Sequence, residues 1–216
     1  MYRQKRQMIP MPKKQFDVCF THKFFIMPYV KVSIPKNGDG AGCADPKSSE
    51  IIVIDVEDIV TEPTREVGNV ELVGDITLKE GAEAVAIYAT SPTIECTEET
   101  SGDVDARGVM QGVAFEHPGD SKDIKNFTEA FMNKGVVILT RSCDGTAKGR
   151  HVYYGNKCNP LFLTTERTDT KEANKRKFTF KQEIAGKFLP GEYSGELPAI
   201  AKTSAELAAD DTEEGA

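Results

Sequence analysis

The sequence lacks the short motifs that mark the commonest catalytic and cofactor-binding sites. It contains no Gly-x-Ser-x-Gly, no His-Glu-x-x-His, no Walker loop and no Cys-x-x-Cys. Histidine is also rare, and its three occurrences are scattered at His22, His117 and His151. No activated nucleophile or acid–base pair emerges, so we expect a protein that is not an enzyme and that uses no cofactor and no metal.

Cysteine is scarce and widely spaced. The five cysteines are Cys19, Cys43, Cys96, Cys143 and Cys158. An odd number at wide spacing favours free thiols in a reducing compartment over a disulfide framework. Cys143 and Cys158 flank His151, but their spacing fits no zinc pattern.

Long hydrophobic runs are missing as well. No run approaches the roughly 20 apolar residues that a membrane-spanning helix needs. The basic start and the apolar stretch at residues 23–30 faintly resemble a signal peptide, but Asp17, His22 and Pro28 interrupt the apolar region. We therefore expect no membrane binding by this chain.

Charge is unevenly distributed along the sequence. The formal net charge is −7, while residues 1–14 carry five basic and no acidic residues and residues 203–216 carry five acidic and no basic ones. The two ends cancel, so the body between them is acidic. An acidic body argues against tight wrapping of nucleic acid, yet it suits a surface past which a polyanion slides without sticking.

What the sequence does contain is β-structure around one amphipathic helix, predicted from about Ser121 to Lys134. Asp120 and Ser121 are good N-cap residues, and Gly135 stands where a left-handed C′ residue would end the helix. The apolar face that should pack on the core consists of Ile124, Phe127 and Phe131.

Strand patterns surround this helix. Strands are expected at residues 30–34, 51–60, 109–115 and 136–140, and the clearest hairpin joins 161–168 to 176–184. Residues 94–105 are interpreted as an acidic connection, and 186–198 as an extended wrap. The predicted fold class is mainly β: an antiparallel β-sandwich or small barrel with one amphipathic helix packed outside.

The predicted organisation is one domain with extensions. Residues 1–15 form a flexible basic arm, 16–200 a single β-rich domain, and 201–216 an acidic tail with little reason to order alone. A long polar loop at 36–49 interrupts the domain, and long loops are usually functional or disordered. The loop residues expected at an assembly interface are Asn37, Asp39, Asp45 and Lys47.

The order of these elements resembles a known family. GVMQGVAF runs into HPG, a single helix follows, and then come VVILT, a Gly-rich turn, YGNKCNPL and a hairpin that ends in FTFKQ. Over roughly residues 50 to 190, this order is similar to that of the major tail tube proteins of long-tailed bacteriophages, of siphovirus and myovirus type.

The resemblance implies a structural function. Family members are β-sandwiches or small barrels that form hexameric rings, and the rings stack into a tube for double-stranded DNA. It implies self-assembly in the bacterial host cytoplasm, a final place in the virion tail, and contacts with tape-measure, tail-terminator and baseplate proteins. An acidic lumen would repel DNA, and the acidic candidates for it are Glu95, Glu98, Glu99, Asp103 and Asp105.

Two alternatives stay open at this point. The chain could be another virion protein, such as a head-decoration, head-completion or baseplate protein, since these reuse similar β-domains. A β-barrel that binds a small ligand is the alternative from another class, because its apolar lining would look like core in the sequence.

Overall fold

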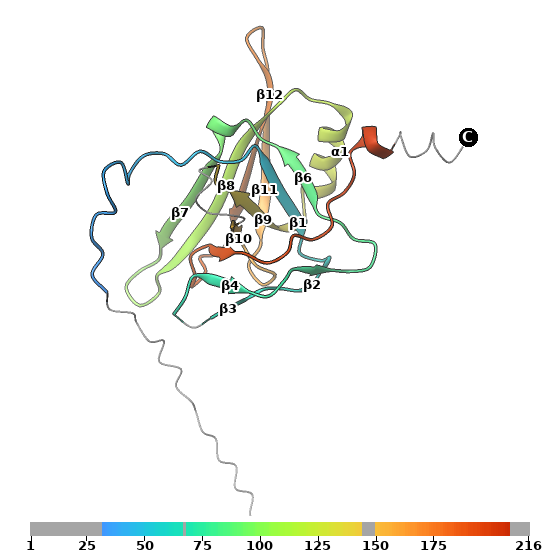
Figure 1. Ribbon diagram of the computed structural model, residues 1–216. Helices are drawn as coiled ribbons and strands as arrows, with labels where there is room; N and C mark the ends of the chain where they lie inside the picture. The colour runs from blue at the N-terminus through green and yellow to red at the C-terminus, as the bar shows by residue number, and fades with distance from the viewer. Residues whose placement is uncertain (1–31, 67, 144–149, 208–216) are drawn as a thin grey trace, which may run out of the picture.

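The computed structural model of the 216-residue chain describes residues 32–66, 68–143 and 150–207 (Figure 1). Its main helix is α1 (Lys122–Phe131), and a short 3-10 helix, η1, spans Ser91–Thr93. The strands are β1 (Glu50–Asp55), β2 (Ile59–Thr61), β3 (Thr64–Arg65), β4 (Glu71–Val73), β5 (Thr77–Leu78), β6 (Val85–Tyr88), β7 (Glu95–Ser101), β8 (Gly108–Pro118), β9 (Gly135–Arg141), β10 (His151–Tyr154), β11 (Leu161–Asp169), β12 (Asn174–Gln182) and β13 (Gly191–Tyr193).

Strand β9 is the branch point of the main sheet. On one edge it pairs with β1, with Leu139 opposite Ile52, and β6 continues beyond β1. On its other edge β9 pairs with β10 over its second half and with β11 at only two positions, Gly135 and Val136. One branch continues from β10 through β13 to β4 and β3, and the other from β11 through β12 and β8 to β7.

The β11–β12–β8–β7 branch folds over β1, β6 and β9 around the larger core. Aromatic side chains of the β11–β12–β8 branch supply its centre, where the Phe115 ring lies 5.5 Å from that of Phe178 and 6.1 Å from that of Phe180. Residues of β1, β6 and β9 fill the opposite wall, among them Ile51, Val53 and Ile138. The fold is therefore mainly β and sandwich-like, as the sequence predicted.

A second core lies on the other face of β1 and β9. Ile52, Ile54 and Leu139 point there and are covered by Ile59, Tyr153 and Tyr193, among others. Because both faces of these two strands are buried, their sequences are continuous apolar runs rather than alternating ones. The β-branched runs IIVI and VVILT are thus explained by position in the fold.

Helix α1 closes one side of the larger core (Figure 1). Ser121 caps it, with its Oγ accepting from the Ile124 N–H at 3.4 Å. Ile124 and Phe127 are buried, and Phe131 packs partly buried beside them. The predicted helix and its apolar face are confirmed, although the α-helix ends at Phe131.

The predicted role of Gly135 was wrong. It is the first residue of β9 and has no positive φ. A side chain at this position would collide with the ring of Pro160, so close packing, rather than a left-handed turn, explains the glycine.

Three other local predictions need correction. Residues 94–105 contain strand β7, which pairs with β8 over its full length. Residues 32–34 of the expected strand at 30–34 form no strand, because no described segment lies beside them to complete a ladder. Residues 204–207 of the tail form a helical turn, which Thr203 and Glu206 cap through their side chains.

The remaining predictions concern the hairpin, the extended wrap and parts of the chain outside the described residues. The hairpin of β11 and β12 is confirmed, with Leu163 opposite Phe180, and the wrap at 186–198 contains β13. The predicted arm at 1–15 and Cys19 lie outside the described residues. Among the described residues, no helix is long and apolar enough to cross a membrane.

Candidate assembly interface

The branch β11–β12–β8–β7 forms a four-stranded antiparallel sheet with one buried and one free face. Val113, Phe115, Phe178 and Phe180 point into the core. Because side chains alternate along a strand, the positions between them point to the other face. That second face bears no helix or strand of the described chain and carries mainly polar residues.

The free face carries charges of both signs. Its acidic residues are Glu95, Glu99, Glu116 and Glu166, and its basic residues are Lys175, Lys177 and Lys181. Two cross-strand ion pairs join them: Lys181 Nζ to Glu99 at 3.2 Å and Lys175 Nζ to Glu116 at 2.9 Å. The formal charge of the face is therefore one unit negative, and its basic residues largely meet acidic neighbours.

Both edges of this four-stranded sheet are open within the described residues. Strand β7 pairs only with β8. Strand β11 pairs with β9 only at Leu161 and Phe162, which leaves residues 163–169 open on that side. The two open edges have the same length, since β7 spans 7 residues.

The hydrogen bonds of the neighbouring strand β8 show which backbone groups of β7 point away from it. The N–H and C=O of Val109 in β8 both bond to Gly186, on the side away from β7. Val109 pairs with Thr100, so this is a non-hydrogen-bonded position and the backbone groups of Thr100 point outward. With the two-residue period, those of Glu98 and Cys96 point outward too. Strand β7 thus presents an unsatisfied ladder, which is a template for pairing with another strand.

Asp120 fixes the long β11–β12 hairpin to the start of α1. Arg167 and Arg176 lie directly opposite each other in the hairpin, and such like charges repel. The Asp120 carboxylate accepts from Arg176 at 2.7 Å and lies 3.1 Å from Arg167 Nε, with Lys125 Nζ at 3.5 Å. Its side chain is 2% exposed. These cations lower the pKa of Asp120, first through the Arg176 hydrogen bond.

We expect Asp120→Asn to destabilise the protein in a pH-dependent way. The carboxyl has an ordinary pKa of 3.8, and the folded state lowers it. The unfolded chain therefore binds the proton more readily, so the stabilisation is present above that pKa and is lost as pH falls through the folded value. Thermal melts should show a lower Tm for the variant at pH 7 and a shrinking difference below about pH 4. A difference that is constant from pH 7 to pH 2 would contradict this role.

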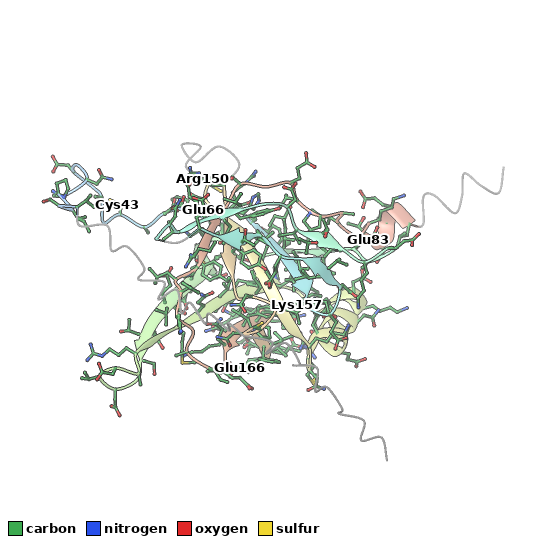
Figure 2. The ribbon with its side chains drawn as sticks, turned by 90° about the horizontal axis from the view of Figure 1, so that it is seen from below. Cys43, Glu66, Glu83, Arg150, Lys157 and Glu166 are labelled. Atoms are coloured by element: carbon green, nitrogen blue, oxygen red, sulfur yellow. The ribbon has the colours of Figure 1, made fainter. Side chains whose placement is uncertain are left out.

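The loop predicted at 36–49 divides into a projecting and an anchored part. Asn37 and Asp39 are exposed, and Asp39 accepts from Lys36 at 2.9 Å. Asp45 accepts from the Ser142 hydroxyl at 2.5 Å, and Lys47 forms a bridge with Ser142 at the end of β9. Residues 36–44 stand away from the body, as Figure 2 shows for Cys43.

The five acidic candidates do not share one surface. Glu95 and Glu99 lie on the free face of the sheet, whereas Glu98 alternates to the other face. There its charge adds to burial, the main cause, in raising the pKa of Tyr154. Asp103 and Asp105 lie in the turn between β7 and β8, where Asp105 has a φ of 69°.

A small cavity of about 130 Å³ lies beside β3, β4 and β10. Its polar groups already have partners within the fold. Glu62 accepts from the Tyr153 hydroxyl at 2.9 Å, Arg65 donates to the Leu189 carbonyl at 2.9 Å, and Gln111 donates to the Phe188 carbonyl at 2.9 Å. These hydrogen bonds connect the segments that line the cavity, so these side chains stabilise the fold.

In comparisons with known proteins, no family model, no curated protein and no solved structure matches this chain. Within residues 32–66, 68–143 and 150–207, no group of three or more His, Cys, Asp or Glu residues could hold a metal ion. Neither open edge could be predicted from the sequence, because edge position depends on which strands pair. The exposed, polar and β-branched pattern ECTEETS was the one local signal for β7.

Proposed function

We propose that this chain is a structural subunit of a bacteriophage tail tube, which assembles as stacked rings of six copies around a conduit for double-stranded DNA. The observation that carries the proposal is the four-stranded sheet with two open edges and one free polar face. The resemblance in element order to tail tube proteins is the reason for proposing a tube and rings of six copies.

The strand directions suit closure of a ring. Successive pairs from β7 through β8 and β12 to β11 are all antiparallel, so β7 and β11 run in opposite directions. Rotation about a ring axis preserves strand direction, and β7 of one copy would therefore meet β11 of the next in antiparallel pairing. Such a head-to-tail contact closes into a ring when the rotation allows it, and the joined sheets leave no open edge.

The free face would then line the channel. Balanced ion pairs with a slight negative excess offer DNA few uncompensated cations, so a moving duplex would not be held at each phosphate. The proposed partners are other copies of this chain, DNA in transit, and the tape-measure, tail-terminator and baseplate proteins of the same virion.

Negative-stain microscopy of the purified protein, combined with sedimentation, tests this function. Stacked rings with a central channel support the tube, and weak DNA binding by free subunits at about 0.15 M salt supports a conduit. A protein that stays monomeric at all accessible concentrations would overturn the proposal. Tight, steeply salt-dependent DNA binding would show a nucleic-acid binder instead.

We expect the projecting loop to be needed for stacking. Deleting residues 37–44 removes the exposed part and keeps Asp45 and Lys47, which hold the chain to β9. The variant should keep the wild-type Tm and still form single rings, but not long tubes, as seen by negative stain. Replacing the same residues by a Gly/Ser segment of equal length distinguishes loop length from loop sequence. Normal tubes from the deletion would refute this role.

A further inference from the structure

The outer edge of β6 is a further open edge, in the layer that faces away from the proposed channel. The Ala89 N–H donates to the Ser49 carbonyl. In the register that pairs Tyr88 with Glu50, this places Tyr88 and Ala86 at non-hydrogen-bonded positions. Their backbone groups therefore point away from β1, and within the described residues nothing bonds to them.

Just before β6, Ala84 already forms an isolated bridge with Ile200. The Ala84 N–H donates to the Ala199 carbonyl at 2.8 Å, and the Ala201 N–H donates to the Ala84 carbonyl at 2.8 Å. The ladder stops there, although Ala86 and Tyr88 continue it. A groove of about 400 Å³ lies over the paired ends of β1 and β6 and is lined by Ser48–Ser49–Glu50 and residues 86–88. Tyr88 is 54% exposed at its rim.

A matching segment lies in the arm that precedes β1. Val32 and Ile34 are 68% and 92% exposed, although the VKVSI sequence of residues 30–34 has a strong strand preference. Two apolar side chains two residues apart lie on one face of an extended chain. An extended segment with one apolar face suits addition as an edge strand, the usual arrangement when a peptide adds to a sheet.

We propose that residues 32–36 of one copy add as a strand to the β6 edge of a second copy, at Ala86 and Tyr88. The arm of the same chain points elsewhere: Figure 2 shows Cys43 and Glu83 on opposite sides of the body. Ile34 precedes Ser48 by 14 residues in the sequence, and an extended chain of that length spans up to about 50 Å. The arm is thus long enough to reach a neighbour.

Charge favours the same pairing. Lys31 and Lys36 flank the segment in the sequence, which has no acidic residue between them. Glu83 lies just before β6, and Glu50 lies in β1 opposite Tyr88. Lys36 of a docked strand would therefore have a carboxylate at either end of the contact with which to pair.

The contact deepens the proposed function, on which it rests, by supplying a link between copies that is separate from the ring edges. It is tested with a photo-reactive phenylalanine analogue at position 34 of the full chain. Equal amounts of ¹⁴N- and ¹⁵N-labelled protein are mixed during assembly, irradiated and analysed by mass spectrometry. We expect mixed-isotope crosslinks to the peptide that contains residues 84–88. The analogue at Val104, which is also exposed, serves as the control and should not label that peptide.

Two variants check the geometry of the contact. Ala86→Pro removes an outward N–H and no bond of the β1–β6 ladder, and Ala86→Ser keeps the N–H. The proline variant should lower the crosslink yield by about tenfold, as loss of a hydrogen-bonded contact implies, and the serine variant should leave it unchanged. Val32→Asp, in the arm, should also lower the yield without disturbing the fold.

The outcomes separate this contact from the tube itself. Same-isotope crosslinks alone, or crosslinks confined to other peptides, would overturn arm docking even where normal tubes form. Mixed-isotope crosslinks at residues 84–88 in a sample that never forms rings would support arm docking and contradict the proposed function.

Discussion

Glu98→Pro should abolish ring formation while leaving the subunit folded. The Glu98 N–H points away from β8, so proline removes a donor from the open edge and keeps the ladder within the chain. In the proposed ring of six copies, every contact between subunits would lack this hydrogen bond, so the losses of binding free energy add up. Sedimentation should therefore show monomers at concentrations where the wild type forms rings.

Glu98→Ala is the matched control for this variant. It removes the same carboxylate but keeps the N–H, so rings should persist. Circular dichroism and a Tm close to the wild-type value establish that the proline variant is folded. Rings of normal size from a folded Glu98→Pro protein would show that β7 takes no part in the joint.

Phe127→Ala should lower the free energy of unfolding by roughly 3–5 kcal/mol, the usual cost of removing a buried phenylalanine ring. Phe127 is 9% exposed. Its ring stacks on Phe131 with centroids 4.6 Å apart and meets Phe178 edge-on at 5.8 Å. It therefore joins α1 to the aromatic centre of the larger core, and its loss leaves a cavity that the two layers fill only in part.

Urea unfolding monitored by circular dichroism measures this effect. Glu129→Ala, at an exposed position of the same helix, should change the unfolding free energy by less than about 0.5 kcal/mol. A loss below 1 kcal/mol for Phe127→Ala would contradict the placement of α1 on the core.

Local signals explain which elements could be predicted from the sequence. Helix α1 has its own cap at Ser121 and an apolar face with helical spacing, and the β11–β12 hairpin alternates cleanly around Phe178 and Phe180. Both elements are specified by neighbours in the chain. The prediction at Gly135 was wrong because the glycine is required for close packing against Pro160, a residue distant in the sequence.

The open edges were harder to predict for the same reason. Strand β7 has polar, exposed side chains on most positions, and its identity as an edge depends on pairing with β8 alone. The branch at β9, where β10 and β11 share one edge, creates the free edge of β11. The acidic candidates were grouped by sequence proximity, whereas strand alternation separates Glu98 from Glu95 and Glu99.

The most direct test of the tail-tube account is a cryo-electron microscopy reconstruction of the assembled protein. We expect stacked rings in which β7 of each copy forms a continuous antiparallel ladder with residues 163–169 of the next. The channel should be lined by the face that carries Glu95, Glu99, Lys177 and Lys181. An assembly joined through other surfaces, or a channel lined by another face, would contradict it.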